Sequence, residues 1–184
     1  FFTQSGFLIG YRLLSELKTT GTLSFKAFYT NRALRILPSY WFVLGLYFLV
    51  PGFSESDTTS PLWKFLTFTQ NFNLDMVNNR GFSHAWSLCV EEHFYFLFPL
   101  SILVLSWFGS IRVVIATWIF VLAGGLIFRH LSWIAYVQPL LSQADSKEMY
   151  VTFYKYFFYP TYNRFDGLAV GAAIAAIAVW YQIG

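Results

Sequence analysis

The stretch that decides the fold is Trp86-Ser-Leu-Cys-Val-Glu-Glu-His-Phe-Tyr-Phe-Leu-Phe-Pro99, which continues as Leu-Ser-Ile-Leu-Val-Leu-Ser-Trp-Phe to Phe108. The run is long enough to cross a bilayer as a helix, yet it holds two adjacent carboxylates, Glu91 and Glu92. A charge at that depth costs roughly 3 kcal/mol, so such residues usually line a site or a water-filled cavity. Function is therefore sought first around Glu91.

The composition of the whole chain agrees with a membrane environment. Of its 184 residues, 57% are hydrophobic and 11% charged, and the mean hydropathy is +0.52, which leaves too few polar side chains to cover a water-soluble globule. The net charge of +3 does not indicate nucleic-acid binding, because the 12 basic residues are spread among apolar segments. Cys89 is the single cysteine and no Cys and His spacing resembles a zinc site, so neither an intrachain disulfide nor a metal is expected.

Five segments reach or approach the length of about 20 apolar residues that a membrane span needs. They are residues 1–14, 38–53, 86–108, 111–128 and 165–183. The first is read as the end of a helix that begins before Phe1. The last carries Gly167, Gly171 and Ala175 four residues apart, a seam of small residues that lets another helix approach closely. The expected fold is all-α, a polytopic transmembrane helical bundle of about five spans plus interfacial helices, with residues 1–184 as one partial membrane domain and no soluble domain.

The first two spans are expected to be joined by a helix on the membrane surface. Apolar residues recur at helical spacing over residues 25–36 behind a Ser24 cap, which predicts an amphipathic helix. Pro38 suits the first turn of the span that follows. Residues 62–72 are apolar but too short to cross.

The connection before the last span, residues 130–163, is expected to be irregular. It holds a half-length apolar run broken at Pro139 and a polar loop at residues 143–148. The aromatic residues that follow, from Tyr150 to Tyr162, fit an interfacial belt.

The charges predict which ends of the helices face the cytoplasm. The first connection holds five cations and one acid, whereas the two longer connections hold acids. The cations are Arg12, Lys18, Lys26, Arg32 and Arg35, the acid among them is Glu16, and the other acids are Glu55, Asp57, Asp75, Asp145 and Glu148. Because cytoplasmic loops are enriched in Lys and Arg, the linker from Arg12 to Arg35 is placed in the cytoplasm. Residues 86–92 and 164–171 then lie at the outer mouth of their helices, and Arg32 and Arg35 at the inner mouth.

Three residues four apart on the third span could share a proton or hydrogen bonds. In Ser87-x-x-x-Glu91-x-x-x-Tyr95, a hydroxyl, a carboxylate and a phenol fall on one stripe of a helix. Glu92 lies about 100° around the axis, on a different face. The alternative is that an acid here only caps the helix N-terminus, where the helix dipole favours an anion.

Two other charged pairs are candidates for binding. Arg32-x-x-Arg35 spaces two guanidinium groups three apart, a fork suited to phosphate oxygens, although basic residues beside a span also simply fix topology and touch lipid headgroups. Arg164 and Asp166 start the last span, where they either pair with each other or let Asp166 orient Arg164 toward an outer cavity. The three histidines, His84, His93 and His130, are read as bystanders at the interface.

As a set, these motifs resemble the acyltransferase-3 family of integral membrane O-acyltransferases. The resemblance rests on four blocks in the expected order along nearly the whole chain. They are Ser5-Gly-Phe-Leu-Ile9, Arg32-Ala-Leu-Arg35-Ile-Leu-Pro38-Ser-Tyr40, His84-Ala-Trp-Ser-Leu-Cys-Val-Glu-Glu-His-Phe-Tyr95 with Pro99, and Arg164-Phe-Asp-Gly-Leu-Ala-Val-Gly171.

The resemblance implies transfer of an acyl group, often acetyl, from cytoplasmic acyl-CoA to a hydroxyl of a carbohydrate, glycan or lipid-linked acceptor. It implies an integral protein of the plasma or bacterial inner membrane, with acyl-CoA as donor substrate and no bound cofactor. Arg32 and Arg35 would bind the donor. The transfer site would be lined by Glu91, Ser87 and Trp86, and the acceptor side by Arg164, Asp166 and Tyr95.

One part of the family pattern is missing from these residues. Family members carry a basic residue and a catalytic histidine in the helix before Ser5-Gly-Phe-Leu-Ile9, and they have about twice as many spans, so this chain is read as a fragment of a longer protein. Neither His84 nor His93 is assigned the missing role. The alternatives kept are a proton- or solute-coupled transporter, in which intramembrane charges serve as relays, and a purely structural membrane partner.

Overall fold

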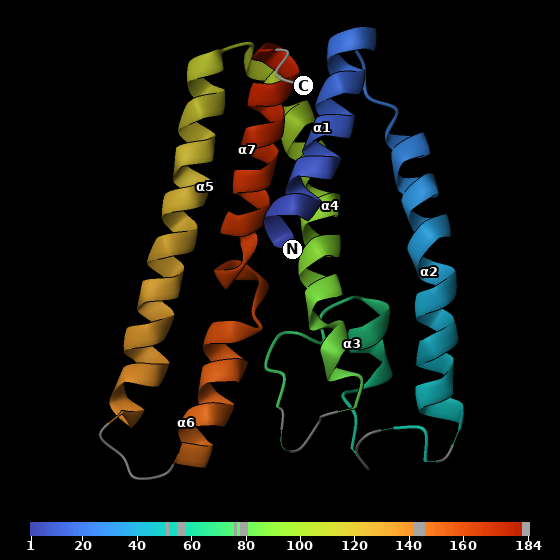
Figure 1. Cartoon of the computed structure of the whole chain (residues 1–184), viewed down its shortest axis with the longest axis vertical. Coiled ribbons are helices and arrows are strands. Elements are labelled where there is room, and N and C mark those ends of the chain that lie inside the picture. Colours follow the sequence, from blue (N-terminus) through green and yellow to red (C-terminus); the bar gives the residue numbers. More distant parts are fainter. Residues whose placement is uncertain (51, 55–57, 76, 78–80, 142–145, 182–184) are drawn as a thin grey trace.

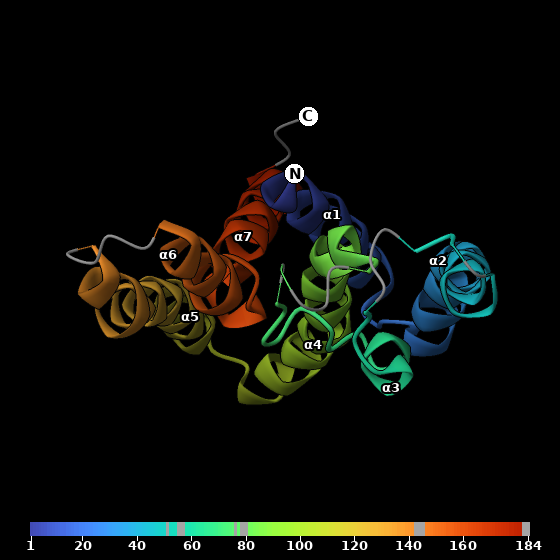
Figure 2. The ribbon, with the colours of Figure 1, turned by 90° about the horizontal axis from the view of Figure 1, so that it is seen from below.

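The computed structural model describes residues 1–50, 52–54, 58–75, 77, 81–141 and 146–181, and this part of the chain is helical with no strand. Seven α-helices form the framework (Figure 1). They are α1 (Phe2–Thr20), α2 (Phe25–Leu49), α3 (Leu62–Leu66), α4 (Trp86–Phe108), α5 (Ile111–Ser132), α6 (Ser146–Thr152) and α7 (Phe165–Tyr181). Viewed from below, α2 lies on one side of the molecule and α5 with α6 on the other, with α7, α1 and α4 between them (Figure 2).

Two of the helical segments are long and apolar enough to cross a membrane. They are Ser83–Phe108 and Ile111–Leu140, whereas Phe165–Tyr181 is apolar but shorter. Only 6% of the apolar window in Ile111–Leu140 is buried inside the protein, so its surface needs an apolar surrounding such as a bilayer. The all-helical prediction is confirmed, while the count of about five spans is not, because α1 and α2 carry several charged residues among their apolar ones.

The predicted boundary at Pro38 is wrong, because the surface helix and the following span form one continuous helix, α2, with Pro38 inside it. Proline removes one backbone hydrogen bond from the helix, but the turn after it is held by burial of Tyr40 and Leu44 against Phe65 and Phe82. Tyr40 also donates to the carbonyl of Phe65 at 3.0 Å. Helix α3 is therefore packed against α2, and it is too short to cross, as expected.

The cap expected at Ser24 takes a different form. Ser24 does occupy the N-cap position of α2, but its side chain makes no capping hydrogen bond. Instead its backbone N–H donates to Glu16 Oε1 at 3.0 Å, which ties the start of α2 to the last turns of α1.

The small-residue seam of α7 is confirmed as a close helix contact. A Cβ added at Gly171 would collide with the backbone of Thr3 and Phe7, and one added at Gly6 would collide with the backbone of Leu168. The backbones of α1 and α7 therefore approach as closely as helices do at small-residue interfaces in membranes. This contact fixes the height and rotation of α1 in the bundle.

The connections divide between the two ends of the molecule as predicted. The α1–α2 and α4–α5 turns and the end of α7 lie at one end, and α3 and α6 lie at the other (Figure 1). Asp75 and Glu148 belong to the second end, and Glu55, Asp57 and Asp145 lie outside the described residues. The assignment of the first end to the cytoplasm stays a prediction.

The irregular connection predicted over residues 130–163 is largely helical. Helix α5 continues past Ser132 through a π-helical turn, Trp133–Val137, and ends in a 3-10 turn, Gln138–Leu140, which contains Pro139, so the helix ends close to the predicted break. After residues 142–145, which are not described, α6 passes into a second π-helical segment, Phe153–Phe158. Aromatic residues join the two segments: Tyr136 and Tyr156 stack with ring centroids 4.4 Å apart. Part of the predicted aromatic belt therefore packs one helix on another.

Candidate active site

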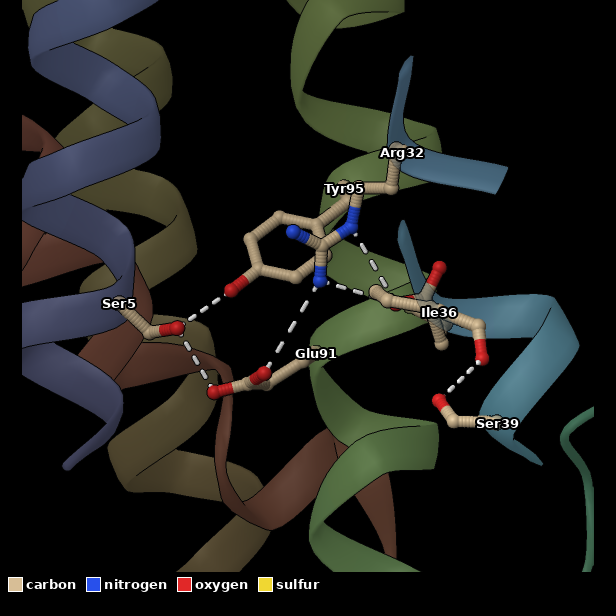
Figure 3. A network of polar contacts seen from close by, with 7 residues as sticks. Ser5, Arg32, Ile36, Ser39, Glu91 and Tyr95 are labelled. Atoms are coloured by element: carbon tan, nitrogen blue, oxygen red, sulfur yellow. Dashed lines mark hydrogen bonds and ion pairs between the residues drawn. The ribbon is translucent and has the colours of Figure 1, made fainter. Parts of the chain in front are cut away.

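A group of polar side chains from three helices meets inside the apolar bundle. Its members are Ser5 of α1, Arg32 of α2, and Glu91, Glu92 and Tyr95 of α4 (Figure 3). Spacing of four along α4 puts Glu91 and Tyr95 on the same side of that helix, toward α1. The cluster is hereafter called the Glu91 cluster.

Glu91 is almost entirely enclosed, with 8% of its surface exposed. Its Oε1 accepts a hydrogen bond from Ser5 Oγ at 2.7 Å, and Ser5 Oγ is also hydrogen-bonded to the Tyr95 hydroxyl. The predicted alignment of Glu91 with Tyr95 is confirmed. In the described part of the chain the Ser87 side chain makes no hydrogen bond to Glu91, and Ser5 of α1 donates to Glu91 instead. That Ser87 lines the transfer site stays a prediction.

Arg32 reaches from α2 to both carboxylates. Its Nε and Nη2 donate to Glu92 Oε1 at 3.2 and 2.9 Å, and Nη2 lies 4.0 Å from Glu91 Oε2. The guanidinium carbon lies 3.3 Å from the centroid of the Tyr95 ring, a close cation–π contact. Although neighbouring residues are about 100° apart around a helix, the Arg32 side chain lies within 4.0 Å of both acids.

This geometry corrects the expectation that Arg32 and Glu91 lie at opposite mouths of the bundle. The error follows from the predicted helix break at Pro38, which put Arg32 in a separate surface helix. In the continuous α2, Arg32 is carried alongside the first half of α4, where Glu92 compensates its charge. Arg35 differs, because it is exposed and no ion pair is recorded for it among the described residues.

A cavity of about 200 Å³ opens between α2 and α4 beside Arg32. It is lined by Tyr29, Arg32, Ala33, Ile36, Leu37, Glu92, Tyr95 and Phe96. The Tyr29 phenol donates a hydrogen bond to the carbonyl of Phe96 at 2.9 Å. The cavity thus offers a cation, a carboxylate and two phenols along otherwise apolar walls.

A second cavity of about 360 Å³ lies on the other side of Phe96 and is mostly apolar. His93 lines it, with Nδ1 2.8 Å from Thr161 Oγ1 and its ring stacked on Phe72. His93 is thus held by ring packing and by one hydroxyl. The reading of this histidine as a bystander stays a prediction.

The charged residues at the start of α7 pair differently from either expectation. Asp166 forms an ion pair with Arg129 of α5, and Arg129 also donates to the carbonyl of Asn163 at 2.9 Å. Arg164 instead donates through Nε to the carbonyl of Phe158 at 2.7 Å. The expected Arg164–Asp166 pair is therefore wrong, and Arg129 was missed because it lies far away in the sequence.

Arg164 lies with Trp86, apart from Tyr95. Its guanidinium carbon is 4.2 Å from the Phe158 ring centroid and 5.9 Å from that of Trp86. Burial and the nearby Arg129 lower the pKa of Arg164, partly offset by Asp166. The predicted transfer and acceptor groups are therefore regrouped: Tyr95 joins Glu91, and Trp86 joins Arg164.

Comparison with known proteins identifies relatives of this chain. The family model of an acyltransferase domain, that of the acyltransferase-3 family, matches residues 1–181. An uncharacterized protein of Haemophilus influenzae (strain Rd) is 33% identical over 130 residues, 61% of this chain and 51% of the relative. The O-acetyltransferase OatA of Staphylococcus aureus (strain NCTC 8325) is 28% identical over 114 residues, 55% of this chain and 19% of that protein. No solved structure matches.

The chain thus spans about half the length of the first relative and about a fifth of the second. The family match, by contrast, includes all but the last three residues of the sequence and every member of the Glu91 cluster. This chain belongs to the acyltransferase-3 family.

Proposed function

We propose that this protein is a membrane O-acyltransferase that moves an acyl group, commonly acetyl, from acyl-CoA to a hydroxyl of a carbohydrate, glycan or lipid-linked acceptor. The observation that carries the proposal is the enclosed Glu91 cluster within a chain that matches the acyltransferase domain over residues 1–181. The name of one relative, an O-acetyltransferase, supports acetyl as the group transferred.

The proposed reaction is direct transfer. The acceptor hydroxyl loses its proton to a base, its oxygen forms a bond to the thioester carbonyl carbon, and the carbon–sulfur bond breaks to release CoA as a thiol that takes up a proton. The base is a group other than Glu91, and Glu91 orients that base or the acceptor hydroxyl. Ser87 belongs to the same first turns of α4 as Glu91, whereas the Trp86 ring lies beside Arg164.

The donor is proposed to bind beside α2. Arg35 has an exposed guanidinium that can take a CoA phosphate in a bidentate contact, and Arg32 lies in the wall of the cavity between α2 and α4. The acceptor is proposed to approach from the other end, past Arg164 and Trp86, with Asp166 holding the start of α7 and Tyr95 at the end of the path. The α1–α2 turn then faces the cytoplasm of a plasma or bacterial inner membrane.

A vesicle assay tests the proposal against its main rival. The full-length protein, in membrane vesicles from the cells that produce it, is given radiolabelled acetyl-CoA, and the label is followed into the carbohydrate and lipid fractions. We expect transfer that depends on the protein and is lost in Glu91→Gln. Uptake of a solute without labelled product would overturn the proposal in favour of a transporter.

A further inference from the structure

Ser5 is the member of the Glu91 cluster that lies on α1. The donor and the acceptor in each of its hydrogen bonds follow from the chemistry of the groups. A hydroxyl carries one hydrogen and accepts others, whereas an ionised carboxylate only accepts. With Glu91 ionised, Ser5 therefore donates to Glu91 Oε1, and Tyr95 donates its hydroxyl hydrogen to Ser5. The result is a chain of donors from Tyr95 through Ser5 to one oxygen of Glu91.

The two oxygens of Glu91 are consequently different. Oε1 is engaged by Ser5 at 2.7 Å. Oε2 lies 4.0 Å from Arg32 Nη2, beyond hydrogen-bond distance, and no hydrogen bond to Oε2 is recorded among the described residues. Figure 3 shows the carboxylate held between Ser5 on one side and Arg32 on the other. Oε2 is thus the oxygen left for a reacting hydroxyl or its base.

The position of Ser5 is itself fixed by backbone packing. Gly6, the next residue, is pressed against the backbone of Leu168, and Gly171 is pressed against that of Thr3 and Phe7. Gly10 repeats the contact one turn later against Ala172 and Ala175. Because α1 cannot slide or turn without breaking these contacts, α7 sets the place at which the Ser5 hydroxyl meets α4.

From these contacts we infer that Ser5 is a positioning residue of the acyl transfer reaction: it holds Oε1 of Glu91 so that Oε2 is presented to the acceptor hydroxyl or to its base. The inference rests on the proposed function. A carboxylate attached by one flexible side chain samples several orientations, and a second fixed donor reduces them to one. Loss of a hydrogen bond that orients a reacting group is expected to lower activity about 10–100-fold, the range typical of hydrogen bonds to metal ligands.

The test uses the full-length protein in the vesicle assay with radiolabelled acetyl-CoA. We expect Ser5→Ala to lower kcat about 10–100-fold while KM for acetyl-CoA changes less than about twofold, because Ser5 does not line the cavity beside Arg32 that is proposed for the donor. Ser5→Thr, which keeps the hydroxyl, is expected to restore most of the lost rate. The matched control is Ser101→Ala, because among the described residues the Ser101 hydroxyl bonds only the carbonyl of Phe98 in its own helix, at 2.7 Å. Its loss is expected to leave kcat unchanged.

The outcomes separate this inference from the proposed function. Wild-type rates in Ser5→Ala, or equal losses in Ser5→Ala and Ser5→Thr, overturn the positioning role while leaving the enzyme assignment intact. Absence of transfer by the wild-type protein overturns the proposed function itself. The melting temperature of each variant in detergent is measured in parallel, and a loss of rate at an unchanged melting temperature supports positioning over folding.

Discussion

Arg32 and Glu92 are joined across the gap between α2 and α4 by two hydrogen bonds to a single carboxylate oxygen, at 2.9 and 3.2 Å. The Arg32 side chain is 16% exposed and that of Glu92 20%, so the pair is largely removed from water. Because little water reaches the pair, each charge is stabilised mainly by the opposite charge of its partner. The pair therefore links α2 to the helix that carries Glu91, and the two arginines of the Arg32-x-x-Arg35 motif have different surroundings.

Alanine substitutions of the two arginines should separate stability from donor binding. Arg32→Ala leaves Glu92 without its counter-ion and is expected to cost about 2 kcal/mol of folding free energy, below the figure for fully buried pairs because water reaches both groups. Arg35→Ala should leave the melting temperature unchanged and raise KM for acetyl-CoA about tenfold if it loses a phosphate contact. Thermal unfolding in detergent and initial rates measure the two effects. Unchanged KM in Arg35→Ala would reduce Arg35 to a topology determinant.

Glu91→Gln should abolish transfer without unfolding the protein. Glutamine has the same size, and its carbonyl oxygen can still accept from Ser5, but it cannot hold a proton or a negative charge. We expect a loss of at least about a hundredfold in kcat, because the base or acceptor hydroxyl that Glu91 orients is then no longer aligned for proton transfer. Glu16→Gln is the control, since the carboxylate of Glu16 accepts from the Ser24 backbone at the α1–α2 turn. A Glu91→Gln protein with wild-type turnover would show that Glu91 has another role.

The helices were predictable from the sequence where the apolar pattern is long and uninterrupted. Residues 86–108 and 111–128 are near matches to α4 and α5, and the seam of Gly167, Gly171 and Ala175 was recognisable because close helix packing requires small side chains. The continuity of α2 through Pro38 was not predictable from the sequence. Local propensity favours a helix boundary there, whereas tertiary burial of Tyr40 and Leu44 keeps the helix continuous.

The candidate site was only partly predictable, for a related reason. Glu91 and Tyr95 share one helix, and helical period alone brings them together. Ser5, Arg32 and Arg129 meet their partners across distances of 34 to 90 residues in the sequence, and no periodicity encodes such contacts. The signal that could have identified Ser5 is its hydroxyl within the apolar segment 1–14, because a buried hydroxyl requires a hydrogen-bond partner.

Gly171→Ala should destabilise the protein although the change adds one methyl group. The new Cβ would meet the backbone of Thr3 and Phe7, which cannot move aside as a side chain can. Overpacking of this kind costs about 1–3 kcal/mol. Gly124→Ala on α5 is the matched control: nothing lies within 4 Å of its added Cβ, and the better helix propensity of alanine should leave the melting temperature equal or slightly higher. Equal melting temperatures of the two variants would contradict the close α1–α7 contact.

Asp166 should be coupled energetically more strongly to Arg129 than to its sequence neighbour Arg164. The ion pair joins Asp166 to Arg129, while Arg164 is held by the carbonyl and ring of Phe158. Two double-mutant cycles test this, combining Asp166→Asn with Arg129→Gln in one and with Arg164→Gln in the other. Asparagine is chosen because its oxygen can keep the bond from the Gly167 N–H that Asp166 Oδ1 accepts at 2.9 Å.

The coupling energies follow from unfolding of each variant in detergent. For Asp166 and Arg129 we expect about 1–3 kcal/mol, the range for contacting charges, since both side chains are partly shielded from water. For Asp166 and Arg164 we expect less than about 0.5 kcal/mol, the level of additive sites. The reverse order would mean that the start of α7 is held by the local pair that sequence spacing suggests, and the regrouping of Arg164 with Trp86 would then be wrong.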